Sequence, residues 1–167
     1  GLASILARRS IAVPIVDALG RRLSIPLLHR FLTKVLYHHT SARNSQVIHA
    51  GINYTPGSLK SKLCVQGRAK LYDFCKTRHI KHENCGKLIV ATDADQLLGL
   101  QSICDRGQNN GVNDLRVISG ADAVSMEPNL SCVGAILSPS TGIVDAPALM
   151  NALLGEAKAS GAMFAYH

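Results

Sequence analysis

Aromatic side chains and long apolar runs are both scarce in this sequence. Aromatics make up only 4% of the 167 residues, tryptophan is absent, and no recognisable nucleic-acid-binding motif interleaves the basic residues. No apolar run is long enough to cross a bilayer. The chain starts at Gly1 without a charged start and an apolar stretch, so no signal peptide is indicated. A nucleic-acid-binding protein and a membrane-spanning protein are therefore both disfavoured.

Paired cysteines are also lacking. The five cysteines are odd in number and scattered, and none of them forms a C-x-x-C pair: Cys64, Cys75, Cys85, Cys104 and Cys132. This usage is typical of reduced, mostly buried thiols in an intracellular protein, and it predicts no metal site.

Acidic side chains are rare in the first half of the chain. Residues 1–82 contain 14 Lys and Arg against two acids, whereas residues 83–167 contain four against nine. We expect part of this positive charge to serve anionic ligands and the rest to be solvated surface. A basic adaptor that binds through residues 18–38 is a further reading, and it depends on charge alone.

An apolar content of 47% is enough to build the core of one domain. The residue pattern predicts alternating helices and strands, which indicates an α/β fold, with α+β as the alternative. Helices are expected from Gly1 to Arg9, from a Thr55-Pro56 cap over about five turns, from Thr92–Asp95 to Asn109–Gly111, from Gly120 to Met126, and from an Asp145 cap to Gly161. Strands are expected at Ile11–Val16, Leu88–Ala91, Leu115–Ser119, Val133–Leu137 and, as a β-like stub, Ala162–Tyr166.

The first elements indicate a nucleotide-binding unit. A helix, a strand and then Asp17 form the order of the second half of a βαβ unit, in which the carboxylate accepts hydrogen bonds from an adenosine ribose. Gly1 would then be the last glycine of a G-x-G-x-x-G turn. A solvated acid at a strand end is the alternative for Asp17, and Pro14 is unusual in a central strand.

Residues 39–54, H-T-S-A-R-N-S-Q-V-I-H-A-G-I-N-Y, hold the densest group of functional side chains. Small polar residues beside Arg43 and a glycine suit a loop that holds a phosphate-bearing ligand. A polar surface turn ahead of the next helix is the alternative interpretation.

The same run resembles the FAD-contacting segment of L-2-hydroxyglutarate dehydrogenases, a branch of the D-amino-acid-oxidase-like flavoenzymes. Three later stretches resemble that family in the same order: P-G-S-L-K-S-K-L-C-V-Q-G from Pro56, C-G-K-L-I-V-A-T from Cys85 and S-P-S-T-G-I-V-D from Ser138. The family connects its ribose-binding acid to this loop by a shorter segment. Residues 18–38 are therefore expected to be a surface insertion, with a membrane-touching amphipathic helix and sequence from outside the ancestral reading frame as alternatives.

The resemblance implies FAD-dependent oxidation of L-2-hydroxyglutarate to 2-oxoglutarate, with a hydride passing to the flavin and electrons then passing to an acceptor such as a quinone. It implies that His49 faces the isoalloxazine ring as a base or charge stabiliser, although a buried structural histidine is the alternative. Tyr54 is the expected substrate-binding residue. The expected cofactor-binding residues are Gly1, Asp17, Thr40, Ser41, Arg43, Asn44 and Ser45.

The implied architecture is a partial Rossmann-like FAD-binding domain with part of a substrate domain. We expect residues 1–54 to belong to the FAD-binding segment, 55–144 to the FAD and substrate domain, and 145–167 to return to the FAD-binding domain. The chain resembles a fragment that lacks the first strand and the C-terminal part, so we expect it to hold FAD weakly by itself. A non-catalytic truncated paralogue is the rival reading. The expected location is cytoplasmic or peripheral to the inner membrane in a bacterium and mitochondrial in a eukaryote.

Overall fold

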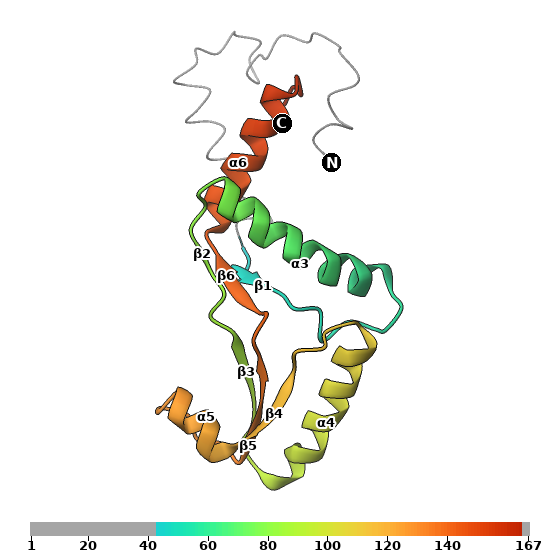
Figure 1. Cartoon of the computed structure of the whole chain (residues 1–167), viewed down its shortest axis with the longest axis vertical. Coiled ribbons are helices and arrows are strands. Elements are labelled where there is room, and N and C mark those ends of the chain that lie inside the picture. The colour runs from blue at the N-terminus through green and yellow to red at the C-terminus, as the bar shows by residue number, and fades with distance from the viewer. Residues whose placement is uncertain (1–42, 165–167) are drawn as a thin grey trace. The chain divides into compact units, whose positions relative to one another are not determined.

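The computed structural model describes residues 43–164, and the predictions for Gly1, Asp17, Thr40, Ser41 and the segment 18–38 lie outside that range (Figure 1). The chain divides into two compact units. One unit is Gln46–Val144, and the other comprises Gly1–Ser45 together with Asp145–His167.

Three short strands of the unit Gln46–Val144 form a small antiparallel sheet. Its order is β1 (Val47–Ile48), β6 (Gly142–Val144) and β2 (His82–Glu83). None of the three was predicted, because two or three residues give no readable alternation and depend on partners far away in the sequence. His82 pairs with Val144, and its half-buried ring lies 6.0 Å from that of Tyr72.

A second antiparallel sheet has the order β3 (Lys87–Ala91), β5 (Gly134–Ser138) and β4 (Arg116–Ser119). All three strands were predicted, and their bounds differ from the prediction by one residue or less at each end. Ile136 lies opposite both Ile89 and Val117, so these three side chains share one face of the sheet. The mixture of helices and antiparallel sheet confirms the expected fold class of helix and strand combined.

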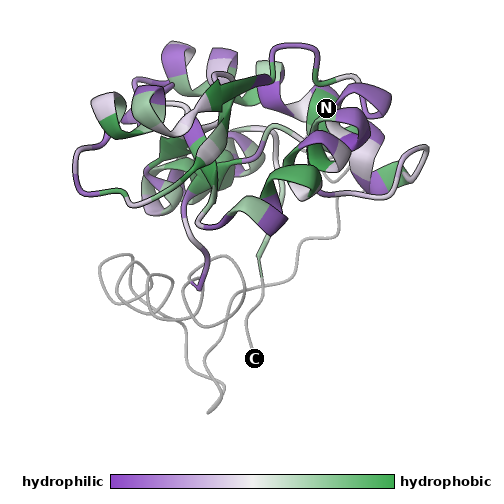
Figure 2. Ribbon diagram, turned by 90° about the horizontal axis from the view of Figure 1, so that it is seen from below, coloured by the Kyte–Doolittle hydropathy of each residue, from purple (hydrophilic) through white to green (hydrophobic). Residues whose placement is uncertain are grey.

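Helix α4 (Ala94–Asn109) covers the same face of that sheet. Asp93 caps the helix by accepting a hydrogen bond from the Gln96 backbone at 3.1 Å, at the predicted helix start. The core forms where Leu100 and Cys104 pack against Ala91 and Ile136. Figure 2 shows hydrophobic residues concentrated on the strands and polar residues on the outer turns of the helices.

Helix α3 (Leu59–Thr77) begins three residues later than a Thr55 cap would require. The Ser58 amide donates to the Thr55 carbonyl at 3.2 Å, and Gly57 has φ +78°, so Thr55–Ser58 form a β-turn with glycine at its third position. Ser58 is the true cap. The apolar helical spacing is misleading at the first turns, because Leu59 and Leu63 are 71% and 57% exposed.

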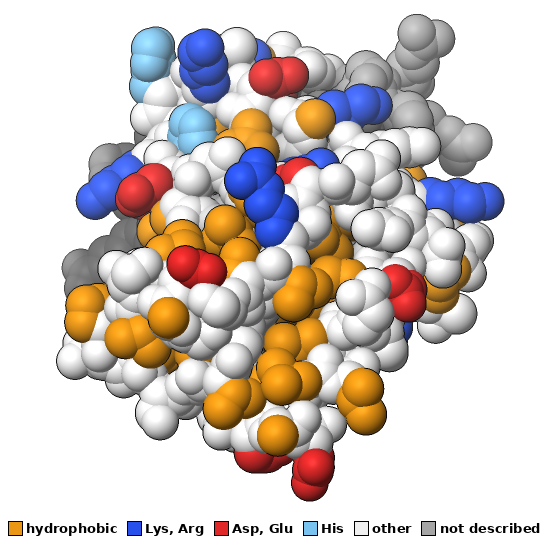
Figure 3. Space-filling view, turned by 60° about the horizontal axis from the view of Figure 1, so that its bottom comes forward, with side chains coloured by type: hydrophobic (Ala, Val, Ile, Leu, Met, Phe, Trp, Pro, Cys, Tyr) orange, Lys and Arg blue, Asp and Glu red, His pale blue; other side chains and the backbone are white. Residues whose placement is uncertain are grey.

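Helix α5 (Gly120–Met126) has the predicted bounds and is capped by Ser119. Several large apolar side chains of this unit stay exposed, namely Leu97, Leu98, Val117, Met126 and Val133. Figure 3 shows hydrophobic side chains gathered on the face viewed from the α4 and α5 end.

In the other unit, helix α6 (Ala146–Ala159) is capped by Asp145 as predicted, with its carboxylate accepting from the Ala148 amide at 2.9 Å. Ser160 is the C-cap of the helix, and Gly161 follows with φ +83°. No strand occurs at 162–164, and the rest of the expected β-like stub lies beyond the described part of the chain.

Candidate active site

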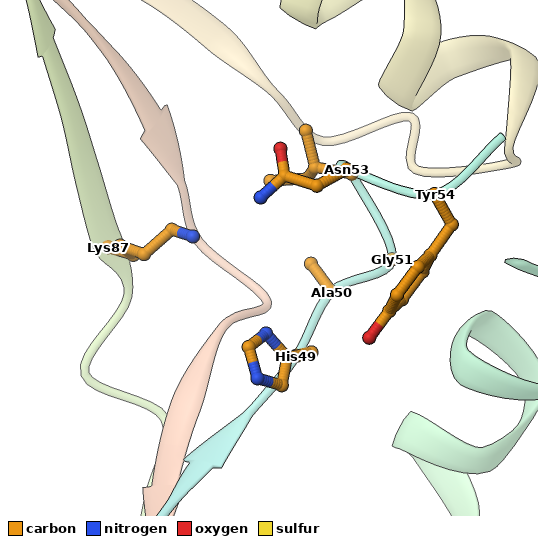
Figure 4. A pocket seen from close by; sticks show the side chains of 7 residues that line it. His49, Ala50, Gly51, Asn53, Tyr54 and Lys87 are labelled. Atoms are coloured by element: carbon orange, nitrogen blue, oxygen red, sulfur yellow. The ribbon is translucent and has the colours of Figure 1, made fainter. Parts of the chain in front are cut away.

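A pocket of about 230 Å³ opens beside the loop that follows β1. Six of its lining residues are consecutive in the sequence, and the seventh comes from the start of β3 (Figure 4). The lining consists of His49, Ala50, Gly51, Ile52, Asn53, Tyr54 and Lys87.

The alternation of the extended chain decides which side chains face the pocket. Ile48, Ala50 and Ile52 are 2–4% exposed and point into the interior. His49 and Asn53 lie between or beside them and are exposed. Because successive side chains of an extended segment point to opposite sides, burying Ile48 and Ala50 turns the His49 imidazole outward. Asn53 lies in the turn that follows Gly51 and is also exposed.

Gly51 lets the loop pass close to helix α3. Its φ is +107°, a region that L side chains rarely adopt, and a Cβ at this position would lie 2.7 Å from Cγ2 of Val65. Both the backbone conformation and the space therefore require glycine.

Asn110, the residue that ends α4, holds the loop by its main chain. Its amide nitrogen lies 3.0 Å from the Gly51 carbonyl, 3.4 Å from that of Ile52 and 2.8 Å from that of Tyr54. The amide oxygen of Asn110 is buried without a hydrogen-bond partner among the described residues. The sequence indicated only a helix stop at this position, and no local signal reveals the second role.

Arg68 of α3 connects the loop to the turn between β5 and β6. Its Nη1 lies 3.4 Å from the Ala50 carbonyl and 2.5 Å from Oγ of Ser140. Ser140 in turn donates to Asp114 at 3.2 Å. The Arg68 guanidinium therefore joins helix α3, the loop and the β5–β6 turn.

His49 and Tyr54, the predicted catalytic and substrate-binding residues, line the same pocket but lie on different sides of the loop (Figure 4). The His49 carbonyl accepts a hydrogen bond from the Cys64 thiol at 3.4 Å. Tyr54 is close to α3, because the Lys60 ammonium lies 5.6 Å from its ring centre. Burial, and then the neighbouring Cys64 thiol, raises the pKa of the Tyr54 phenol, so the phenol is protonated at neutral pH.

The pKa of the Cys64 thiol is raised chiefly by burial, and Tyr54 and Arg68 oppose this shift. Burial also raises the pKa values of the Cys75 and Cys104 thiols. These thiols are therefore protonated at neutral pH.

Lys87 is a pocket residue that sequence reasoning missed. It begins β3 and is half-buried, and its ammonium points toward the Asn53 amide across the pocket (Figure 4). The sequence signal was a single lysine ahead of the apolar run Leu88–Ala91, which by itself resembles a solvated strand end.

The predicted cofactor residues that the structure describes are Arg43, Asn44 and Ser45. All three are exposed in the segment ahead of β1, and they belong to the unit that does not contain the pocket. Within residues 43–164, no group of three or more His, Cys, Asp and Glu side chains is arranged to hold a metal ion. No helix in the described part of the chain has the length and apolar content needed to cross a membrane.

Comparison with known proteins assigns the class. The family model for FAD-dependent oxidoreductases of the DAO type matches residues 18–167, and the chain belongs to that family. The chain is 48% identical over 115 residues to the mitochondrial L-2-hydroxyglutarate dehydrogenase of Arabidopsis thaliana, covering 69% of this chain and 24% of that protein. It is 47% identical over 112 residues to the Nematostella vectensis protein of the same name, covering 67% and 25%.

Among solved structures, this chain is similar to the dithionite-reduced L-alpha-glycerophosphate oxidase of Mycoplasma pneumoniae with FAD bound. The TM-score is 0.68 and the sequence identity is 25%, over 74% of this chain and 33% of that one. The chain thus spans about a quarter of the length of the curated relatives that it matches. These matches confirm the resemblance found in the sequence.

Proposed function

We propose that the protein oxidises the 2-hydroxyl group of L-2-hydroxyglutarate to the ketone of 2-oxoglutarate, with FAD as its cofactor. The observation that carries this proposal is the 48% identity to a protein named L-2-hydroxyglutarate dehydrogenase. The relatives are named mitochondrial, so a mitochondrial location is proposed if the source is a eukaryote. A quinone is the proposed final electron acceptor.

The chemistry of the loop ahead of β1 fits an anionic cofactor. Arg43, Asn44 and Ser45 are exposed and contain a guanidinium, an amide and a hydroxyl group. These are donors that phosphate oxygens accept. We propose that these three residues, with Gly1, Asp17, Thr40 and Ser41, hold FAD, which supplies the two-electron acceptor when bound.

His49 is proposed as the residue that handles the proton. Oxidation of a secondary alcohol removes a hydride from carbon and a proton from oxygen, so a base must face the hydroxyl group. The imidazole of His49 is exposed at the pocket, while its backbone is fixed by the Cys64 thiol and by the buried residues on either side. Tyr54 is proposed to contact the substrate as a neutral phenol.

The test uses the protein expressed from its complete gene and loaded with FAD. Reduction of a dye acceptor is measured with L-2-hydroxyglutarate, its D enantiomer, glycine, L-proline and glycerol 3-phosphate. We expect rapid reduction with the first compound alone. Turnover of a different compound, or a protein that retains no flavin, would refute the proposal, and the second result would favour the non-catalytic paralogue.

The role of His49 is tested by His49→Ala in the same protein. We expect flavin absorbance to be retained and the rate of flavin reduction to fall by about 10²–10⁴-fold, the usual contribution of general acid–base catalysis. His79→Asn is the matched control, because His79 is exposed at the end of α3 with φ +54°, a conformation that asparagine tolerates. An unchanged rate for His49→Ala would assign a structural role to this histidine.

A further inference from the structure

The pairing of β3 turns Lys87 toward the covered face of its sheet. Lys87, Ile89 and Ala91 alternate along the strand and therefore point to the same side. Ala91 belongs to the core cluster that α4 covers, and Ile89 packs against it. Lys87 thus places a charged side chain at the end of this face, where the residue opposite it in the sheet is Ser138. A half-buried lysine of this kind usually has a charged partner.

No acidic group in the described part of the chain compensates this charge. Residues 43–164 contain no ion pair to Lys87, and no aspartate or glutamate lines the pocket. The polar side chains that line the pocket with Lys87 are those of His49, Asn53 and Tyr54 (Figure 4). A half-buried cation is more stable with an anion beside it than without one, because desolvation weakens its interaction with water.

The volume of the pocket suits a small anion. Its volume of about 230 Å³ is below the roughly 300–1,000 Å³ that is common for pockets of drug-sized ligands. A short carboxylate matches this volume and offers two oxygens, one for the ammonium and one for an amide N–H.

We propose that Lys87 is a substrate-binding residue that takes a carboxylate group of a small dicarboxylate, with the Asn53 amide as a second donor. This assignment rests on the proposed function for the identity of the substrate, and it deepens that function by naming the side chain that selects for charge. His49 borders the same pocket, so a carboxylate held by Lys87 would orient the rest of the molecule next to the imidazole.

The first experiment measures binding without turnover. Glutarate has both carboxylates but no hydroxyl group, so it cannot be oxidised. Its dissociation constant is measured by calorimetry for the FAD-loaded protein from the complete gene and for Lys87→Met and Lys87→Arg. We expect Lys87→Met to weaken glutarate binding by about 10- to 100-fold, the range for losing a hydrogen bond to a charged group. Lys87→Arg should restore part of the affinity.

Lys81→Met is the control, because Lys81 is exposed and does not line the pocket. Equal glutarate affinity in Lys87→Met and the unmutated protein would overturn the assignment, as would an absence of glutarate binding. Loss of flavin absorbance in Lys87→Met would also overturn it, since the lysine would then serve the cofactor. These readouts do not depend on which hydroxy acid is oxidised, so the assignment and the proposed function can fail separately.

The second experiment identifies the carboxylate. The KM and kcat of Lys87→Met are compared for L-2-hydroxyglutarate and L-2-hydroxypentanoate, which lacks the second carboxylate. A rise in KM for the dicarboxylate alone means that Lys87 binds the 5-carboxylate, and an equal rise for both means that it binds the 1-carboxylate. Unchanged KM values for both compounds would refute a contact with either group.

Discussion

Replacing Gly51 with alanine should destabilise the loop that forms the pocket, and the structure separates two causes. The φ of +107° is unfavourable for any residue with a Cβ, at a cost of about 1–2 kcal/mol. The new Cβ would also lie 2.7 Å from Cγ2 of Val65, about 1 Å closer than the usual 3.5–4.0 Å contact. Overpacking of this kind costs about 1–3 kcal/mol.

Together the two effects predict a loss of about 2–5 kcal/mol from a total stability of the order of 5–15 kcal/mol. The assay is urea unfolding of the 167-residue chain, followed by far-UV circular dichroism. With a slope near 2 kcal/mol per molar urea, the midpoint of Gly51→Ala should fall by about 1–3 M.

Two further variants isolate the clash. Gly57→Ala has the same kind of backbone strain, with φ +78°, but no heavy atom lies within 4 Å of its new Cβ, so it should lose only about 1–2 kcal/mol. In the double variant Gly51→Ala/Val65→Ala the clashing methyl group is removed, and the loss should be smaller than the sum of the two single losses. If Gly51→Ala costs no more than Gly57→Ala, or if the two changes are additive, the argument from close approach is wrong.

Two more predictions concern the groups around the loop. Asn110→Asp replaces the donor nitrogen with an acceptor that faces three carbonyls, so the free energy of unfolding in urea should fall by about 1–3 kcal/mol. Asn113→Asp is the control, because Asn113 is exposed. An equally small loss in both variants would contradict the prediction. Stability should also fall as the pH rises above neutral through the alkaline range. Burial raises several thiol and phenol pKa values in the folded state, so these groups ionise more readily in the unfolded chain. Their contribution to the stability of the fold is therefore fully present only below their ordinary pKa values. The groups are Cys64, Cys75, Cys104, Tyr54 and Tyr72. Urea midpoints that stay constant or increase up to about pH 10 would show that burial does not favour their neutral forms.

Local signals determined the longer elements. Helix α5 occupies the predicted residues 120–126, and α4 lies between the Asp93 cap and the Asn109–Gly111 stop that the sequence indicated. Caps, stops and helical periodicity depend on residues a few positions apart, so they can be recognised without knowing the fold. The family resemblance was visible for the same reason, because its motifs are contiguous stretches of sequence.

Contacts between distant segments determined what the sequence did not reveal. Strands β1, β2 and β6 exist only because they pair with one another, and Leu59 and Leu63 are exposed although they lie one helical turn apart. Lys87 became a pocket residue through the pairing of β3 with β5 and through the loop at 49–54. The sequence alone identified the family, the main helices and the candidate residue His49. Only tertiary packing brought Lys87 to the pocket that His49 and Asn53 line, because its position depends on long-range strand pairing that no local pattern encodes.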